Sequence, residues 1–160
     1  MTLPVEPLSR EAFQPFGQVI DATGESFEIN DGYARRFHDQ VRIEVGEHGR
    51  PCVSVFVARA RALPLTIDLL EHHPRGSQAF VPMEPAPYLV VVAPPGPVDP
   101  RAIRAFVAIR QGVNYAPGTW HFPLISLKDD ARFLVIDRAG PGDNCVETPI
   151  DPPRVIEALP

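Results

Sequence analysis

The chain has 160 residues, a hydrophobic content of 44% and a formal net charge of −5. This length is enough for one domain with a buried core, which we expect to span residues 1–160, and the hydrophobic content is that of a folded globular protein. The negative charge and the lack of a Lys/Arg cluster exclude nucleic acid as an expected partner. Apolar runs are far shorter than the ~20 residues that cross a bilayer, and the first residues lack signal-peptide features. We therefore expect a cytoplasmic protein that does not enter membranes.

The first part of the chain predicts one short helix and several strands. Ser9 is a suitable N-cap for a helix that ends before Pro15, and residues 17–20 follow as a strand. Apolar and polar side chains alternate over residues 41–45, which predicts a half-buried strand. The nearly continuous apolar run over residues 52–58 predicts a strand that is buried on both faces.

The second part consists mostly of short apolar runs separated by turns. Residues 65–71 are the exception, because Ile67, Leu70 and Glu71 have the spacing of one helix face, which predicts a short helix. Further strands are predicted over residues 77–81, 88–93, 105–109, 124–127 and 133–136. Short strands at this spacing, with 20 prolines in the chain, indicate an all-β fold with a few short helices. A double-sheet jelly roll fits best, because its mouth collects residues from well-separated strands.

The segment that begins at Glu71 contains candidate metal ligands. Jelly rolls of the cupin type supply a His-x-His pair, an acid a few positions later and a distant second histidine. Counted from His73, the first histidine position holds Glu71, the acid position holds Gln78, and His121 is the distant histidine. These residues form a nitrogen and oxygen donor set for nickel, zinc or manganese. The alternative is that His73 and Gln78 only hydrogen-bond to the pocket wall. We expect the adjacent His72 to be a surface or turn residue.

A second polar cluster leads up to His121. It contains Asn114, Tyr115 and Trp120, which we expect to share a pocket with the first segment and to contact a substrate. Histidine titrates near neutral pH, so His121 is a candidate general base or acid, and Trp120 can form a pocket wall. The alternative is a core tryptophan beside a hydrogen-bonded histidine.

Arg36, Phe37 and His38 form the third candidate cluster. In an extended segment Arg36 and His38 share one face while Phe37 lies on the other. A guanidinium binds a carboxylate in a bidentate manner and an imidazole transfers protons, so the pair is suited to a small anionic ligand. Asp39 is placed to orient His38. A solvated, charged edge strand is the alternative.

Short motifs that extend in order from Leu8 to Cys145 resemble one known family. They are Leu8-Ser9-x-Glu11-Ala12-Phe13, Ile29-Asn30-x-Gly32, Arg36-Phe37-His38-Asp39, Leu63-Pro64-Leu65-Thr66-Ile67, His73-Pro74-x-Gly76-x-Gln78-Ala79-Phe80-x-Pro82-Met83, Gln111-Gly112-Val113-Asn114-Tyr115, Trp120-His121-x-Pro123-Leu124, Ile136-Asp137-Arg138 and Asp143-Asn144-Cys145. Together they resemble the ureidoglycolate lyase family of allantoin catabolism. Phe122 stands where the family often has a further histidine.

The resemblance implies a homodimeric, cupin-like β-barrel that cleaves (S)-ureidoglycolate to glyoxylate and urea, with nickel or another divalent ion as cofactor. Arg36 would then bind the substrate carboxylate, His121 would be the base and His38 the acid. Glu71, His73 and Gln78 would bind the metal or polarise the substrate hydroxyl, which a metal ion would make more acidic. Two alternatives remain open: an amidohydrolase that releases ammonia from the same substrate, and a non-catalytic cupin-type module that binds a small molecule.

Overall fold

The computed structural model describes residues 1–160 and consists almost entirely of β-strands, which confirms the predicted all-β class. The strands are β1 (Val5–Pro7), β2 (Gly17–Ile20), β3 (Phe27–Ile29), β4 (Ala34–Arg36), β5 (Arg50–Ala58), β6 (Leu65–His72), β7 (Gln78–Pro82), β8 (Tyr88–Ala93), β9 (Arg104–Ala108), β10 (Gly112–Tyr115), β11 (Trp120–His121), β12 (Ile125–Ser126), β13 (Ala131–Ala139) and β14 (Val146–Ile156). Helical structure is limited to α1 (Arg10–Phe13) and the 3-10 turns η1 (Asn30–Gly32) and η2 (Pro100–Ala102). None of it is long and apolar enough to cross a membrane.

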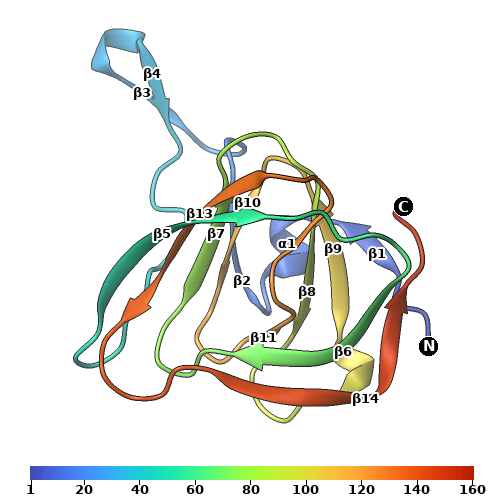
Figure 1. The fold of residues 1–160 in the computed structure, drawn as a ribbon. Helices are drawn as coiled ribbons and strands as arrows, with labels where there is room; N and C mark the ends of the chain where they lie inside the picture. Colours follow the sequence, from blue (N-terminus) through green and yellow to red (C-terminus); the bar gives the residue numbers. More distant parts are fainter.

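Two curled sheets form a half-barrel of the cupin-like type (Figure 1). One sheet has the strand order β1-β9-β8-β11-β6-β14, with β12 also paired to β8, and the other has the order β2-β10-β7-β13-β5. Phe80, Phe106 and Phe133 belong to a core made by residues of both sheets. The two sheets therefore close over a shared aromatic interior, as a jelly roll requires.

Strand β8 lies at the centre of the fold and is buried along its whole length. Val90 and Val92 belong to the core shared by the two sheets. Leu89 and Val91 alternate with them and belong to a second core, which also contains Ile67 of β6. Because successive side chains of a strand point to opposite faces, β8 contributes to two cores at once.

The predicted burial of residues 52–58 on both faces is wrong. These residues lie in β5, an edge strand that pairs only with β13. Phe56 is 40% exposed, although its ring approaches that of Phe80, with centroids 5.7 Å apart. Val53, Val55 and Val57 point outward and are 64%, 52% and 62% exposed. Nothing in the chain covers the outer face at this edge, so the apolar run indicates a surface stripe.

Two further predictions of local structure are wrong. Residues 65–71 are not helical but form β6, because both of its edges are paired, to β14 and to β11. Residues 41–45 are not a strand. Their backbone is held by side chains: Ser77 Oγ accepts from Glu44 N at 2.8 Å, and Arg138 Nε donates to the Val45 carbonyl at 2.8 Å. Residues 41–45 therefore form an irregular segment whose backbone is hydrogen-bonded to side chains of the barrel.

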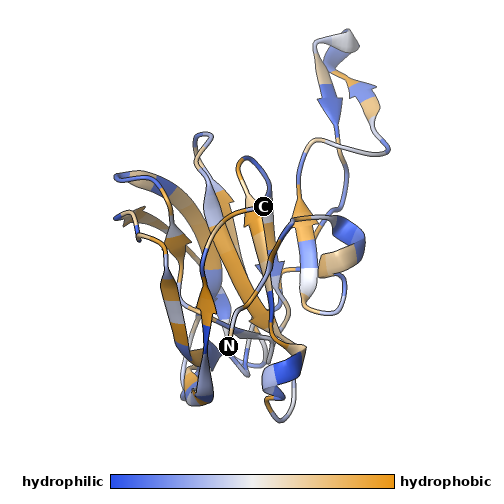
Figure 2. Cartoon of the chain, turned by 90° about the vertical axis from the view of Figure 1, so that its right-hand side faces the viewer, coloured by the Kyte–Doolittle hydropathy of each residue, from blue (hydrophilic) through white to orange (hydrophobic).

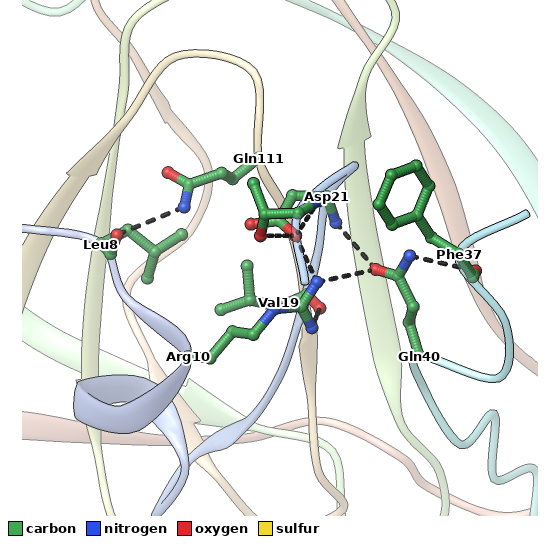
Figure 3. A network of polar contacts seen from close by, with 8 residues as sticks. Leu8, Arg10, Val19, Asp21, Phe37, Gln40 and Gln111 are labelled. Carbon is green, nitrogen blue, oxygen red and sulfur yellow. Dashed lines mark hydrogen bonds and ion pairs between the residues drawn. The ribbon is translucent and has the colours of Figure 1, made fainter. Parts of the chain in front are cut away.

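Residues 22–39, which contain β3, η1 and β4 and which we call the arm, stand clear of the barrel (Figures 1 and 2). A polar network fixes the base of the arm (Figure 3). Arg10 of α1 forms an ion pair with Asp21, and Gln40 Oε1 accepts from Asp21 N at 2.9 Å. Gln40 Nε2 also donates to the Phe37 carbonyl at 3.1 Å. Hydrogen bonds therefore fix both ends of the arm to the barrel and hold the arm in its projecting position.

Candidate active site

A cluster of three potential metal ligands lies at one end of the barrel. Glu71 of β6 and His121 of β11 are directly paired across the sheet, and His73 follows β6 by one residue. One ligand atom from each of the three residues lies within 4.8 Å of the others. The structure thus brings together three of the four predicted metal ligands. The fourth, Gln78, begins β7 and contacts His73.

His73 is held at Nδ1 by a main-chain oxygen atom. Its Nδ1 lies 2.6 Å from the Asn144 carbonyl, which makes Nδ1 the donor and directs Nε2 toward the cluster. Nε2 lies 3.2 Å from Gln78 Oε1, and Gln78 Nε2 donates to Asp137 Oδ2 at 3.3 Å. The imidazole is therefore oriented by its Nδ1 hydrogen bond, and Gln78, which is fixed by Asp137 of β13, lies beside Nε2.

His121 is 2% exposed and has an unused nitrogen. Its Nδ1 lies 3.1 Å from the Thr119 carbonyl, and its ring stacks on Tyr115 with centroids 4.4 Å apart and planes 11° apart. Nε2 lies 3.4 Å from Glu71 Oε1, but this approach is not a well-directed hydrogen bond, and the buried nitrogen has no hydrogen-bond partner. Buried polar atoms are nearly always paired, so this nitrogen is available to a ligand.

The charges of the cluster are coupled. The His121 imidazole lowers the pKa of the Glu71 carboxyl, against the opposing effect of partial burial. Burial raises the pKa of the Tyr115 hydroxyl, with a further contribution from Glu71. Burial together with Glu71 likewise raises the pKa of the Cys145 thiol, whose Sγ lies 3.8 Å from Glu71 Oε2. Glu71 is therefore the ionised group around which the site is arranged.

The cluster fits a divalent metal ion. Two imidazoles and a carboxylate are donors that zinc, nickel and manganese accept, and the unpaired Nε2 of His121 is aimed at the same space as Glu71. Gln78 adds only a neutral amide oxygen, already in contact with His73. Chemically, the arrangement can bind a metal or hold a proton on a buried imidazole beside a carboxylate.

The other predicted substrate contacts have structural partners in the chain. Trp120 Nε1 donates to the Gly96 carbonyl at 2.7 Å, and its ring packs on His72 with centroids 4.2 Å apart. His72 is therefore half-buried, and its predicted place at the surface is wrong. Its pKa is lowered by burial and by the neighbouring His73 and His121. Asn114 Nδ2 donates to Gln18 Oε1 and to the Arg42 carbonyl, while its buried Oδ1 has no partner.

Within a single chain, Arg36 and His38 do not lie at the cluster. Arg36 ends β4, opposite Phe27 and away from the η1 tip, and His38 lies on the return to the barrel, while the arm leaves the barrel beyond Ile20. Strand β2 pairs with β10 so that Ile20 faces Gly112 and Gly17 faces Tyr115, the residue stacked on His121. The arm and the cluster therefore lie at opposite ends of the barrel, and Figure 1 shows β3 and β4 far from β11, which carries His121.

Two residues that orient the site were not assigned this role from the sequence. Asn144 binds His73 through its carbonyl and Arg75 N through its side chain, and Asp137 binds Gln78. Both residues lie in motifs that carry the family resemblance, and this was the only indication in the sequence that they belong to the site. Every residue has a main-chain carbonyl, so a contact such as that of the Asn144 carbonyl with His73 cannot be recognised from residue types.

The fold and the cluster define a cupin-like β-barrel with a histidine–carboxylate site at one end. The family model for ureidoglycolate lyase matches residues 1–157. A ureidoglycolate lyase of Azotobacter vinelandii (strain DJ / ATCC BAA-1303) is 52% identical over 149 residues, which cover 91% of this chain and 90% of that protein. Ureidoglycolate lyases of Burkholderia mallei (strain NCTC 10229) and Pseudomonas syringae pv. tomato (strain ATCC BAA-871 / DC3000) are 52% and 46% identical, over 91% of this chain and 88% of each relative. The chain belongs to the ureidoglycolate lyase family.

Proposed function

We propose that the chain is a ureidoglycolate lyase, which cleaves (S)-ureidoglycolate to glyoxylate and urea. The observation that carries this proposal is the buried Nε2 of His121, which has no hydrogen-bond partner and lies 3.4 Å from Glu71 Oε1. The family model and the curated relatives support the choice of substrate. Lyase chemistry on this substrate needs a proton acceptor in a water-poor site, and His121 meets that need.

In the proposed reaction His121 removes the proton of the substrate hydroxyl at Nε2. The hydroxyl oxygen then becomes the carbonyl oxygen of glyoxylate as the bond from the central carbon to the ureido nitrogen breaks. Glu71 stabilises the imidazolium that forms, and the stacked Tyr115 ring keeps the imidazole in place. A general acid protonates the departing nitrogen of urea, and we assign this role to His38.

We also propose that Glu71 and His73, together with Gln78 or His121, hold a divalent ion, with nickel as the first candidate and zinc or manganese as others. Such an ion supplies a Lewis acid that makes a hydroxyl group more acidic. His121 acts either as a ligand of this ion or as the base. Metal affinity of a His121 variant separates the two roles, because a base can be removed without loss of the ion.

The substrate carboxylate requires a cation, and we assign Arg36 to it. Asn114, Tyr115 and Trp120 remain our predicted substrate contacts. Tyr115 is the one among them whose ring touches His121. Asn114 and Trp120 also hold neighbouring backbone, so their replacement should disturb the walls of the site as well as binding.

We further propose a cytoplasmic homodimer. The exposed stripe Val53, Val55 and Val57 on the edge strand β5 supports association, because long apolar edges are normally covered. Cys52 and Cys145 are both free, which supports a reducing compartment.

Product analysis tests the function. The purified protein is incubated with racemic ureidoglycolate, before and after exhaustive chelation, and glyoxylate, urea and ammonia are measured. Equal amounts of glyoxylate and urea are expected from one enantiomer. Ammonia in place of urea would identify an amidohydrolase, and binding without turnover would identify a non-catalytic module. Full activity after chelation would exclude a required ion.

A further inference from the structure

The arm presents an apolar face that carries a free arginine. The pairs Phe27–Arg36 and Ile29–Ala34 lie opposite each other across the two strands and therefore share one face. Phe27 is 50% exposed and its ring approaches His38, with centroids 6.1 Å apart. Arg36 makes no hydrogen bond or ion pair, whereas Arg35 on the opposite face donates to Ser26 Oγ at 2.9 Å. An isolated two-stranded ribbon is at best marginally stable in water, so this face calls for a cover.

The barrel has a matching uncovered surface. Val53 and Val55 of β5 are paired with Ile136 and Leu134 of β13, and these four apolar side chains line the same outer face. Val57 continues the stripe toward the end of β5. Contiguous exposed apolar surface of this kind marks an association site. Each chain thus has two apolar surfaces, the arm and this stripe, that nothing in the chain covers.

No arginine or lysine side chain is paired with the carboxylates of the site at the other end of the barrel. Glu71 and Asp137 place two carboxylates there, and neither is paired with an arginine. The Arg138 guanidinium is held by the carbonyls of Val45 and Pro141, at 2.8 and 2.9 Å. The Arg75 side chain donates to the Asp143 carbonyl at 2.8 Å. A substrate carboxylate that enters this site meets two like charges, so a cationic side chain would favour its binding beside the proposed metal ion.

A two-fold dimer resolves all three observations. Two-fold axes that cross the strands at right angles exchange the two ends of the barrel, so the arm of one copy lies at the end where the other has its cluster. We propose that the chain forms such a dimer, in which each arm packs against the partner and delivers Arg36 to the partner's Glu71-His73-His121 cluster. Each site is then assembled from both copies. The role of Arg36 as a carboxylate ligand rests on the proposed function, but the exchange of arms does not.

Heterodimers test the exchange. Arg36→Ala and His121→Ala chains are co-expressed with different affinity tags, and the mixed dimer is purified on both tags. If the arm acts on the partner, one site of this dimer has an intact arm and an intact cluster, and about half of the wild-type activity is expected. If the arm acts on its own chain, both sites are defective and the activity is that of the single variants. Wild-type activity in the Arg36→Ala homodimer would also overturn the proposal. The Arg35→Ala variant is the matched control and should keep its activity, because Arg35 lies on the opposite face.

The reciprocal dimer gives the opposite result. A chain with both substitutions is paired with a wild-type chain. Only the one intact cluster is active, and it receives an Arg36→Ala arm, so activity should fall to about half of that of the Arg36→Ala homodimer. About half of the wild-type activity would show that each arm serves its own chain and would overturn the proposal. If the wild-type protein itself releases no urea, the proposed function fails, and a cross-link between the two chains decides the exchange.

A cross-link tests the exchange without turnover. Cys145 is exposed and lies beside Glu71, so it reports on the site. Arg36→Cys is introduced into a Cys52→Ser background and treated with a short bismaleimide. A covalent dimer is expected on a denaturing gel, and it should vanish when Cys145→Ser is added. A chain that remains monomeric on the gel, or a dimer that persists without the thiol at position 145, would overturn the proposal.

Discussion

Replacing Glu71 by Gln tests the charge coupling on which the proposed base depends. The substitution keeps the shape of the side chain and removes the charge that lies 3.4 Å from Nε2 of His121. At that distance two unit charges attract by about 5 kcal/mol at an effective dielectric constant near 20, before the cost of desolvation. Once Nε2 has taken up the substrate proton it can donate to Glu71, and a hydrogen bond between charged groups retains a net ~2 kcal/mol, which corresponds to a ~30-fold lower kcat in the variant.

The same variant has a defined effect on stability. The pKa of Glu71 is lowered in the folded protein by His121, so its contribution to stability is complete above the ordinary pKa of about 4.3 and is lost as the pH falls through the folded value. Wild-type protein should therefore unfold at a higher guanidinium concentration than the variant at neutral pH, and the gap should narrow as the pH falls through the lowered pKa of Glu71.

Steady-state kinetics at neutral pH and guanidinium unfolding at several pH values measure the two effects. Glu71→Asp serves as the control, because it keeps the charge but shortens the side chain. Wild-type kcat in Glu71→Gln, together with a stability gap that does not change with pH, would refute the coupling of Glu71 and His121.

Two further predictions concern the metal and the dimer. His73→Ala should abolish binding of one nickel, zinc or manganese ion per chain in isothermal titration calorimetry. Gln78→Ala should weaken this binding less, because an amide is a poorer ligand than an imidazole. Equal metal binding by the two variants would remove His73 from the ligand set. Val55→Lys places a charge in the exposed stripe of β5. It should shift the protein from dimer to monomer in sedimentation experiments without loss of folded structure. An unchanged dimer would show that the interface does not include this stripe.

The sequence was informative where local patterns reflect burial. The apolar run of residues 88–93 forms β8, and Ser9 accepts a hydrogen bond from Ala12 N as the N-cap of α1. It misled where pairing partners decide the structure. Residues 65–71 combine a helix-like spacing with alternation, and only the presence of β14 and β11 on both edges selects the strand. Similarly, the apolarity of β5 could not distinguish a core strand from an edge strand with an exposed stripe.

The candidate site shows the same division. Glu71, His73 and His121 were predicted together because a spaced pattern of ligands reflects the geometry of a barrel end, and the structure places their ligand atoms within 4.8 Å of one another. Arg36 and His38 were predicted from their chemistry alone. Their place at the opposite end follows from the direction of β2, which no local pattern contains. Whether a second copy returns them to the site depends on assembly, which lies beyond the reach of one chain's sequence.

The most direct test of the central claim is the rate of urea release by wild-type and His121→Ala protein. His121 supplies the buried nitrogen that we propose to be the base, and loss of a general base costs about 10²- to 10⁴-fold in kcat. We predict equal release of urea and glyoxylate by the wild type and a loss of this size in the variant, with the fold retained by circular dichroism. A folded His121→Ala protein that releases urea at the wild-type rate would contradict the account.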